Sequence, residues 1–266
     1  MKLKTIVILF NILVVATFLM VVLMPLFLLG AGYSRAFWEG NWYLAVLFLL
    51  VLVVLNWYFL VNGPLFTALE REDWNAVVTT MKRRLHRRGG ISPSSLQLLA
   101  NACVVSGNAG ELLAVEEFLR ERKPQVIRRS CRLFAVPHLL SNNGEQMQRY
   151  FASQIETGDP WMRWGLAFSL LLQGQFEPAR GELQHLLEGK DAGLVRALSI
   201  YLLSTCSAGD AAATAAADAA KSEFVAAVDR RQWRELVDKE RQELHVMVLG
   251  RLLTDVERDI YGDTHE

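Results

Sequence analysis

The strongest constraint on this chain is the scarcity of charge at its N-terminal end. Its first 62 residues contain four charged side chains, whereas 52 of the other 204 residues are charged, the ordinary proportion for a soluble domain. Two apolar runs lie in this first part, at residues 5–29 and 42–61. A helix rises about 1.5 Å per residue, so each run is long enough to cross the hydrocarbon core of a bilayer. We predict a transmembrane helical hairpin over residues 1–64 and a separate domain over residues 65–266.

The charges that flank the two runs predict their orientation. The first run is too long for the apolar part of a signal peptide, so we interpret both runs as uncleaved spans. The connection at residues 30–43 carries one positive and one negative charge and is rich in aromatic residues, as at a membrane interface. Basic residues lie beyond the other ends of the runs, at Lys2, Lys4 and residues 81–88. The positive-inside rule then places both chain ends in the cytoplasm, at the inner membrane of a bacterial cell.

Two amides inside the runs suggest a contact between the spans. In an antiparallel hairpin, residues at equal depth have a constant sum of residue numbers, and Asn11 and Asn56 satisfy that condition for helix ends near residues 5 and 62. Such a pair can form a hydrogen bond across the hairpin. The alternative is that each amide lies near the cytoplasmic interface and is hydrated. Neither run contains Asp, Glu, Lys, Arg or His, which disfavours an ion or proton path.

The pattern from residue 65 onward is helical. Apolar residues recur at spacings of three and four, without a sustained alternation of β-branched and polar residues. Glycine, proline and asparagine interrupt this pattern about every 15 to 20 residues, which predicts short antiparallel helices. The alanine run at residues 211–220 favours a further helix over a flexible linker. Residues 224–260 predict two closing helices, so the fold class is all-α.

A longer period is superimposed on the helical pattern. Gly107 and Gly174 follow comparable helices and are 67 residues apart, close to twice 34. The segment at residues 165–191 resembles a tetratricopeptide repeat (TPR), with consensus-like residues at Leu166, Ala167, Leu170, Gly174, Phe176, Ala179, Leu183 and Leu186. Residues 95–124 resemble a second repeat, and the segments around Trp74 and Trp233 are similar to further ones. The resemblance implies a TPR-like α-solenoid in which stacked helix pairs share one core.

The resemblance also implies a groove that binds segments of other proteins, since the first helices of the repeats line such a groove in this family. The residues at the matching positions are Gln97, Asn101, Trp161, Trp164, Phe168 and Arg196. Aromatic rings beside a cation suit a partly apolar peptide, and Trp and Arg are common energetic hot spots of interfaces. The alternative is that Trp161 and Trp164 pack against the helix predicted at residues 147–151.

Charge is unevenly distributed along the helical domain. Residues 63–132 carry 12 basic and 7 acidic side chains, whereas residues 133–266 carry 13 and 20. The basic cluster nearest the predicted spans consists of Lys82, Arg83, Arg84, Arg87 and Arg88. We predict that this cluster faces anionic membrane lipids. The alternative is a solvated helix end that only sets the topology, and nucleic-acid binding is disfavoured because the domain as a whole is not basic.

The sequence contains no recognisable catalytic or cofactor motif. Phosphate-binding glycine loops, the GxSxG nucleophile motif and the HExxH zinc motif do not occur. Glu182 and His185 have the helical spacing of di-iron sites, but no second pair accompanies them, so we interpret them and His245 as surface residues. Three cysteines without short spacing predict buried, reduced thiols. We predict no catalytic residue, metal, cofactor or small-molecule substrate.

These observations favour one function and leave two alternatives open. The favoured one is a membrane-anchored TPR-like scaffold or adaptor that binds protein partners at the cytoplasmic face of the membrane. One alternative is a structural or assembly subunit of a larger membrane complex, in which the hairpin makes the key contacts. The other is an enzyme whose site has no recognisable motif.

Overall fold

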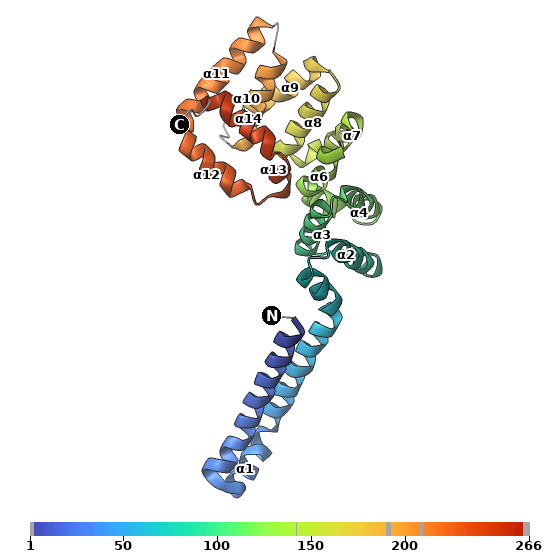
Figure 1. Ribbon diagram of the computed structural model, residues 1–266, viewed down its shortest axis with the longest axis vertical. Helices are drawn as coiled ribbons and strands as arrows, with labels where there is room; N and C mark the ends of the chain where they lie inside the picture. The colour runs from blue at the N-terminus through green and yellow to red at the C-terminus, as the bar shows by residue number, and fades with distance from the viewer. Residues whose placement is uncertain (1–2, 142, 190–192, 208–209, 263–266) are drawn as a thin grey trace. The chain divides into compact units, whose positions relative to one another are not determined.

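The computed structural model describes residues 3–141, 143–189, 193–207 and 210–262. Within these residues the secondary structure consists of helices joined by turns and loops, without a β-strand (Figure 1). The expected all-α fold class is therefore confirmed. The chain divides into two compact units, residues 1–87 and 88–266. Residues 65–87, which the sequence assigns to the helical domain, fall within the first of these units. We describe each unit by itself.

Unit 1 begins with α1 (Leu3–Glu70), which is interrupted at two residues. Gly30 has a φ of 83°, and Asn41 also departs from helical geometry, so α1 consists of three helical segments. Two apolar stretches, Ile8–Leu28 and Gly30–Glu70, are long and apolar enough to cross a membrane. The connection predicted at residues 30–43 is thus largely helical, and the second long segment continues past residue 61 without a break.

The two long segments of α1 lie side by side and antiparallel (Figure 1). Asn56 Nδ2 donates a hydrogen bond of 2.7 Å to Asn11 Oδ1. Two aromatic pairs flank this bond, Phe10 with Phe59 and Phe18 with Phe48, at centroid distances of 6.3 and 5.0 Å. The two amides that the residue-number sum placed at equal depth are therefore directly bonded in the structure.

A tight turn reverses the chain after α1. Glu72 has a φ of 55°, in the left-handed region, and Asp73 Oδ1 accepts a hydrogen bond from the N–H group of Ala76 at the start of the next helix. This next helix, α2 (Trp74–Arg88), buries one apolar face and exposes the other, more polar one. The buried residues of α2 are Val77, Val78, Met81 and Leu85.

Unit 2 contains the remaining helices of the described chain. They are α3 (Pro93–Val105), α4 (Ala109–Arg122), α5 (Pro124–Arg129), α6 (Cys131–Ser141), α7 (Gly144–Gln154), the 3₁₀ turn η1 (Ile155–Thr157), α8 (Pro160–Leu172), α9 (Phe176–Leu187), α10 (Leu194–Cys206), α11 (Ala211–Ala227), α12 (Arg230–Glu240), α13 (Leu244–Val248) and α14 (Gly250–Tyr261). The alanine run lies in α11, as expected, whereas three short helices replace the two predicted at residues 224–260.

Local sequence explains where these helices begin. Ser92, Asn143 and Asp159 accept hydrogen bonds from the first turns of α3, α7 and α8, and Asp229 forms a reciprocal capping box with Gln232 on α12. Such side chains pair the N–H groups that a helix start leaves without a partner. Proline follows the cap in α3 and α8, where its fixed φ suits the first helical position.

The core of unit 2 forms between helices that are mostly neighbours in the chain. α7, α8, α9, α10 and α11 pack consecutively, and α13 and α14 return to contact α6 and α10. α7 and α8 approach closely because α8 has Gly165 where it meets the Phe151 ring, and a Cβ atom built there would lie 2.3 Å from that ring. This packing brings the N-terminal ends of α8 and α10 near the chain's C-terminal helices.

Candidate functional site

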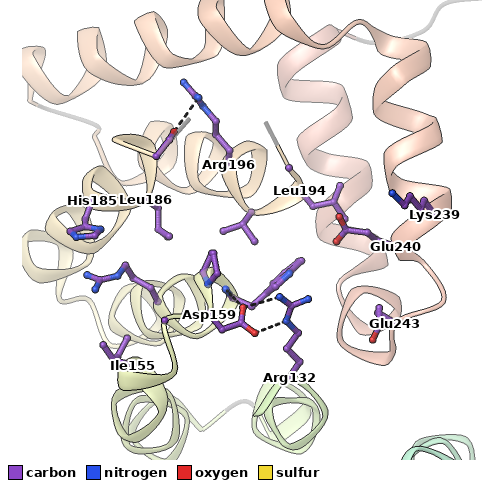
Figure 2. Close-up of a pocket in the computed structure, with 17 residues that line it drawn as sticks. Arg132, Ile155, Asp159, His185, Leu186, Leu194, Arg196, Lys239, Glu240 and Glu243 are labelled. Carbon is purple, nitrogen blue, oxygen red and sulfur yellow. Dashed lines mark hydrogen bonds and ion pairs between the residues drawn. The ribbon is translucent and has the colours of Figure 1, made fainter. Parts of the chain in front are cut away.

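A cleft of about 650 Å³ lies in unit 2 where the ends of several helices converge (Figure 2). α8 and α10 contribute their first turns, α9 its last turn, and α12 its last residues. Apolar side chains from these ends include Ile155, Trp161, Leu186, Leu194 and Val195. Charged and polar side chains surround them, namely Arg132, Asp159, Arg163, His185, Arg196, Lys239, Glu240 and Glu243. The cleft thus combines an apolar part with charged walls.

Asp159 organises the side of the cleft formed by α6 and α8. Its Oδ1 accepts a 3.0 Å hydrogen bond from the Trp161 N–H group and caps α8. Arg132 on α6 donates to both oxygens of the same carboxylate, with Nε–Oδ2 and Nη2–Oδ1 distances of 2.6 and 3.1 Å (Figure 2). Two-pronged pairing of this kind fixes geometry as well as charge. Asp159 therefore ties α6 to the start of α8 and positions Trp161.

Trp161 forms the border between the cleft and the core. Its ring packs edge-on against His245 of α13 at a centroid distance of 4.6 Å, and against Trp164 at 5.8 Å. Burial, helped by the nearby charge of Arg132, lowers the pKa of His245 to about 4. His245 is consequently neutral near pH 7 and packs as an uncharged ring. The sequence interpretation of His245 as a surface residue is therefore wrong.

The cations on the opposite side are held by ion pairs. Arg163 Nη1 lies 2.8 Å from Glu182 Oε2, and Arg196 Nη2 lies 2.8 Å from Glu223 Oε2. Arg196 Nη1 also donates to the Gly189 carbonyl oxygen at 3.3 Å. Because these pairs fix the guanidinium groups at the ends of α8 and α10, the basic side of the cleft is ordered before any ligand binds.

The structure separates the six residues predicted to bind a partner. Trp161 and Arg196 both line the cleft. Trp164 does not line the cleft, since its side chain is buried with 1% exposure where α8 packs into the core, and Trp161 itself is only 6% exposed. Phe168 is half-buried and stacks on Trp164 at 5.3 Å. Gln97 and Asn101 are exposed on α3 and do not line the cleft.

Sequence reasoning missed a buried polar cluster between α4, α6 and α7. His138 Nε2 lies 2.9 Å from Glu116 Oε2, and Arg120 pairs with the other oxygen of the same carboxylate. The His138 ring stacks on Tyr150 at 4.3 Å, and burial holds the pKa of the Tyr150 phenol well above its usual value. The one signal in the sequence was an acidic residue, Glu116, within the apolar stripe of α4.

This buried cluster borders a second cleft, of about 620 Å³. Each of its ionisable members pairs with another member or with the backbone, as Tyr150 does by donating a 2.6 Å hydrogen bond to the Cys131 carbonyl. Within the described residues, no group of three His, Cys, Asp or Glu side chains is arranged to hold a metal ion. We therefore take the cluster as a structural element that joins three helices.

The basic residues predicted to face the membrane all lie on α2, but they differ in their surroundings. Arg83 and Arg87 are exposed, and Lys82 is half-buried. Arg84 instead donates to Asn62 Oδ1 at 2.8 Å and to the Val61 carbonyl oxygen at 3.0 Å. Arg88 ends the helix, and its side chain lies outside the described part of the structure.

The comparisons with known proteins identify related proteins, and the descriptions of these proteins name no activity. A family model described as "Uncharacterised Treponema protein" matches residues 111–262, more than half of the chain. The chain is also 28% identical to an "Uncharacterized protein" of Treponema pallidum (strain Nichols), over an alignment that covers 96% of this chain and 86% of that protein. Because nearly the whole chain is covered, this similarity includes the apolar N-terminal unit. No solved structure matches the chain.

Proposed function

We propose that this chain, which belongs to the family described as uncharacterised Treponema protein, is a membrane-anchored scaffold whose TPR-like helical domain binds a segment of a partner protein. In this proposal, the two long segments of α1 span the inner membrane, and both chain ends lie in the cytoplasm. Their apolar side chains are exposed to solvent, which supports a lipid environment. α8 and α10 begin at Pro160 and Leu194, 34 residues apart, and this spacing supports the resemblance to TPR proteins.

The cleft beside Trp161 is the observation that carries the proposal. It is lined by the first turns of two successive repeat-like helices, and it joins an apolar surface to fixed cations. A partner segment with one apolar side chain and adjacent acidic groups would complement this arrangement. Gln97 and Asn101, exposed on α3, are positions where a longer segment could make further contacts.

Site-specific photo-crosslinking in intact membranes tests this proposal. A photoreactive residue at His185, at the edge of the cleft, should give a discrete crosslinked protein, whereas the same residue at exposed Glu177, outside the cleft, should not. Leu186→Arg, which places a charge on the apolar part of the cleft, should abolish the product from position 185. Equal crosslinking from both positions, or a product unaffected by Leu186→Arg, would contradict the proposal.

Replacing the hairpin tests the alternative of a complex subunit. If the cleft carries the function, residues 1–64 can be exchanged for an unrelated two-span hairpin of the same orientation without loss of the crosslinked product. If the hairpin makes the key contacts, the exchange should remove the protein from its complex while the cleft remains intact. Two features of α1 motivate this test. The amides Asn11 and Asn56 are hydrogen-bonded, and the aromatic residue Trp57 is exposed.

A further inference from the structure

The basic residues of α2 lie much closer to the apolar part of α1 than their position in the sequence suggests. Arg84 is 22 residues after Asn62, and a continuous helix of that length would place them roughly 33 Å apart. The left-handed turn at Glu72 instead reverses the chain, so that the Arg84 guanidinium group contacts Asn62 and Val61. Val61 is the last residue of the second apolar run. The turn of α2 that carries Arg84 therefore lies beside the end of this run.

Arg84 makes a specific clasp on α1. Its Nη1 donates to Asn62 Oδ1, and its Nη2 donates to the Val61 carbonyl oxygen. The Asn62 side chain is held in turn by a 2.8 Å hydrogen bond from its Nδ2 to the Tyr58 carbonyl oxygen. Pro64 comes two residues later, and proline in a helix interior crowds and weakens the preceding turn. Arg84 thus stabilises the turn of α1 that Pro64 weakens and fixes α2 to it.

The clasp determines which side chains of α2 face outward. Val77, Met81 and Leu85 lie on the buried face, and Arg84 lies at its edge. Arg83, His86 and Arg87 occupy the exposed face, with Lys82 half-buried beside them. From Trp74 to Arg88 the helix contains no acidic residue, so every charge that α2 itself carries is positive.

We propose that this face of α2, which we call the basic face (Lys82, Arg83, His86 and Arg87), binds the anionic phospholipid headgroups of the bilayer that holds α1. The inference rests on the proposed membrane insertion of α1 but not on partner binding at the cleft. Charge complementarity supports it, because clusters of Lys and Arg next to a membrane span attract anionic lipids. Continuity with the span supports it too, because Arg84 holds α2 at Val61 and Asn62. Arg84 acts as a positioning residue and does not itself contact lipid.

The test uses the full-length protein in lipid nanodiscs made either of phosphatidylcholine or of phosphatidylcholine mixed with phosphatidylglycerol. Hydrogen exchange of α2 amides and native mass spectrometry of retained lipid are the two measurements. In the mixed discs, the wild type should retain phosphatidylglycerol preferentially and show slower exchange in α2. The triple variant Lys82→Gln/Arg83→Gln/Arg87→Gln should lower this lipid preference by about tenfold or more. A matched triple variant of exposed arginines in unit 2, Arg149→Gln/Arg231→Gln/Arg241→Gln, should leave it unchanged.

Arg84→Met tests the clasp separately, since it keeps an apolar stem and removes the donors. It should speed exchange of α2 amides in both kinds of disc and weaken the preference for phosphatidylglycerol, although the basic face is intact. A wild type without lipid preference, or equal losses in the two triple variants, would overturn the proposal. Extraction of membranes with alkaline carbonate separates this failure from failure of insertion, because a non-inserted protein would appear in the soluble fraction.

Discussion

The two units of this protein differ in whether their large apolar side chains are exposed or buried. In unit 1 the large apolar side chains of α1 point outward, and Trp57 is 66% exposed. In unit 2 the largest apolar side chains lie inside, and Trp164 is 1% exposed. A water-filled surrounding would favour burial in both units, because transfer of apolar surface out of water stabilises a fold. Under the proposed membrane insertion of α1, the two units face different solvents, lipid and water. The positive mean hydropathy of +0.20 is then an average over unlike parts.

The comparison is tested most strongly by removing one tryptophan from each unit. Trp164→Ala empties a site in the core of unit 2 and should lower its unfolding free energy by about 3–5 kcal/mol. Trp57→Ala removes a side chain from the outer surface of α1. It should change the unfolding free energy of unit 1 by less than about 0.5 kcal/mol. Urea unfolding in mild detergent, followed by circular dichroism, measures both. Similar losses in the two variants would mean that Trp57 is covered by protein.

A pH titration tests the burial of His245, which links α13 to Trp161. Its pKa of about 4 lies below the ordinary value of 6.5, so the unfolded chain binds the proton more tightly. The contribution of His245 to stability should be complete above pH 6.5 and should fall as the pH drops toward 4, by at most about 3 kcal/mol. His245→Gln should flatten this part of the stability profile. An unchanged slope in His245→Gln would show that the ring is solvated.

Local signals in the sequence were sufficient to predict several helix starts and one contact between the two long segments of α1. Helix starts at Asp159 and Asp229 follow from capping chemistry that involves only a few neighbouring residues. The Asn11–Asn56 bond could be predicted because two antiparallel helices joined by a short connection have one register. Both inferences depend on short stretches of chain with little conformational choice.

Contacts between distant segments were the part that the sequence could not supply. The α13 segment returns to α6 and covers one side of Trp161, so His245 is buried by residues more than 80 positions away. The fold-back of α2 depends on a single left-handed residue, Glu72, a conformation that glycine or asparagine would have signalled better. The spacing of apolar residues shows which face of a helix is buried, but it does not show which later segment packs on that face.

Two glycines of unit 2 differ in the space around them, and replacing each by alanine tests the packing within this unit. Gly165→Ala places a Cβ atom 2.3 Å from the buried ring of Phe151, and forcing α7 and α8 apart should cost about 1–3 kcal/mol. Gly181→Ala, in the interior of α9 with open space around it, should instead stabilise the protein by about 0.5–1 kcal/mol. The same unfolding experiment measures both signs. Stabilisation by Gly165→Ala would mean that α7 and α8 are not in close contact.

The smallest expected effect concerns the polar contact inside the apolar unit. In lipid there is no water to compete for the amides, yet hydrogen bonds between membrane helices contribute only about 0.6 kcal/mol on average and up to about 1.7 kcal/mol. A double-mutant cycle of Asn11→Leu and Asn56→Leu isolates this coupling, because each single variant leaves the other amide without its 2.7 Å partner. The unfolding free energy of the hairpin in bicelles, measured by steric trapping, should show a coupling within this range. Strictly additive effects would indicate that the two amides are hydrated separately, and the hairpin would then depend on its aromatic pairs, such as Phe18 with Phe48, for its register.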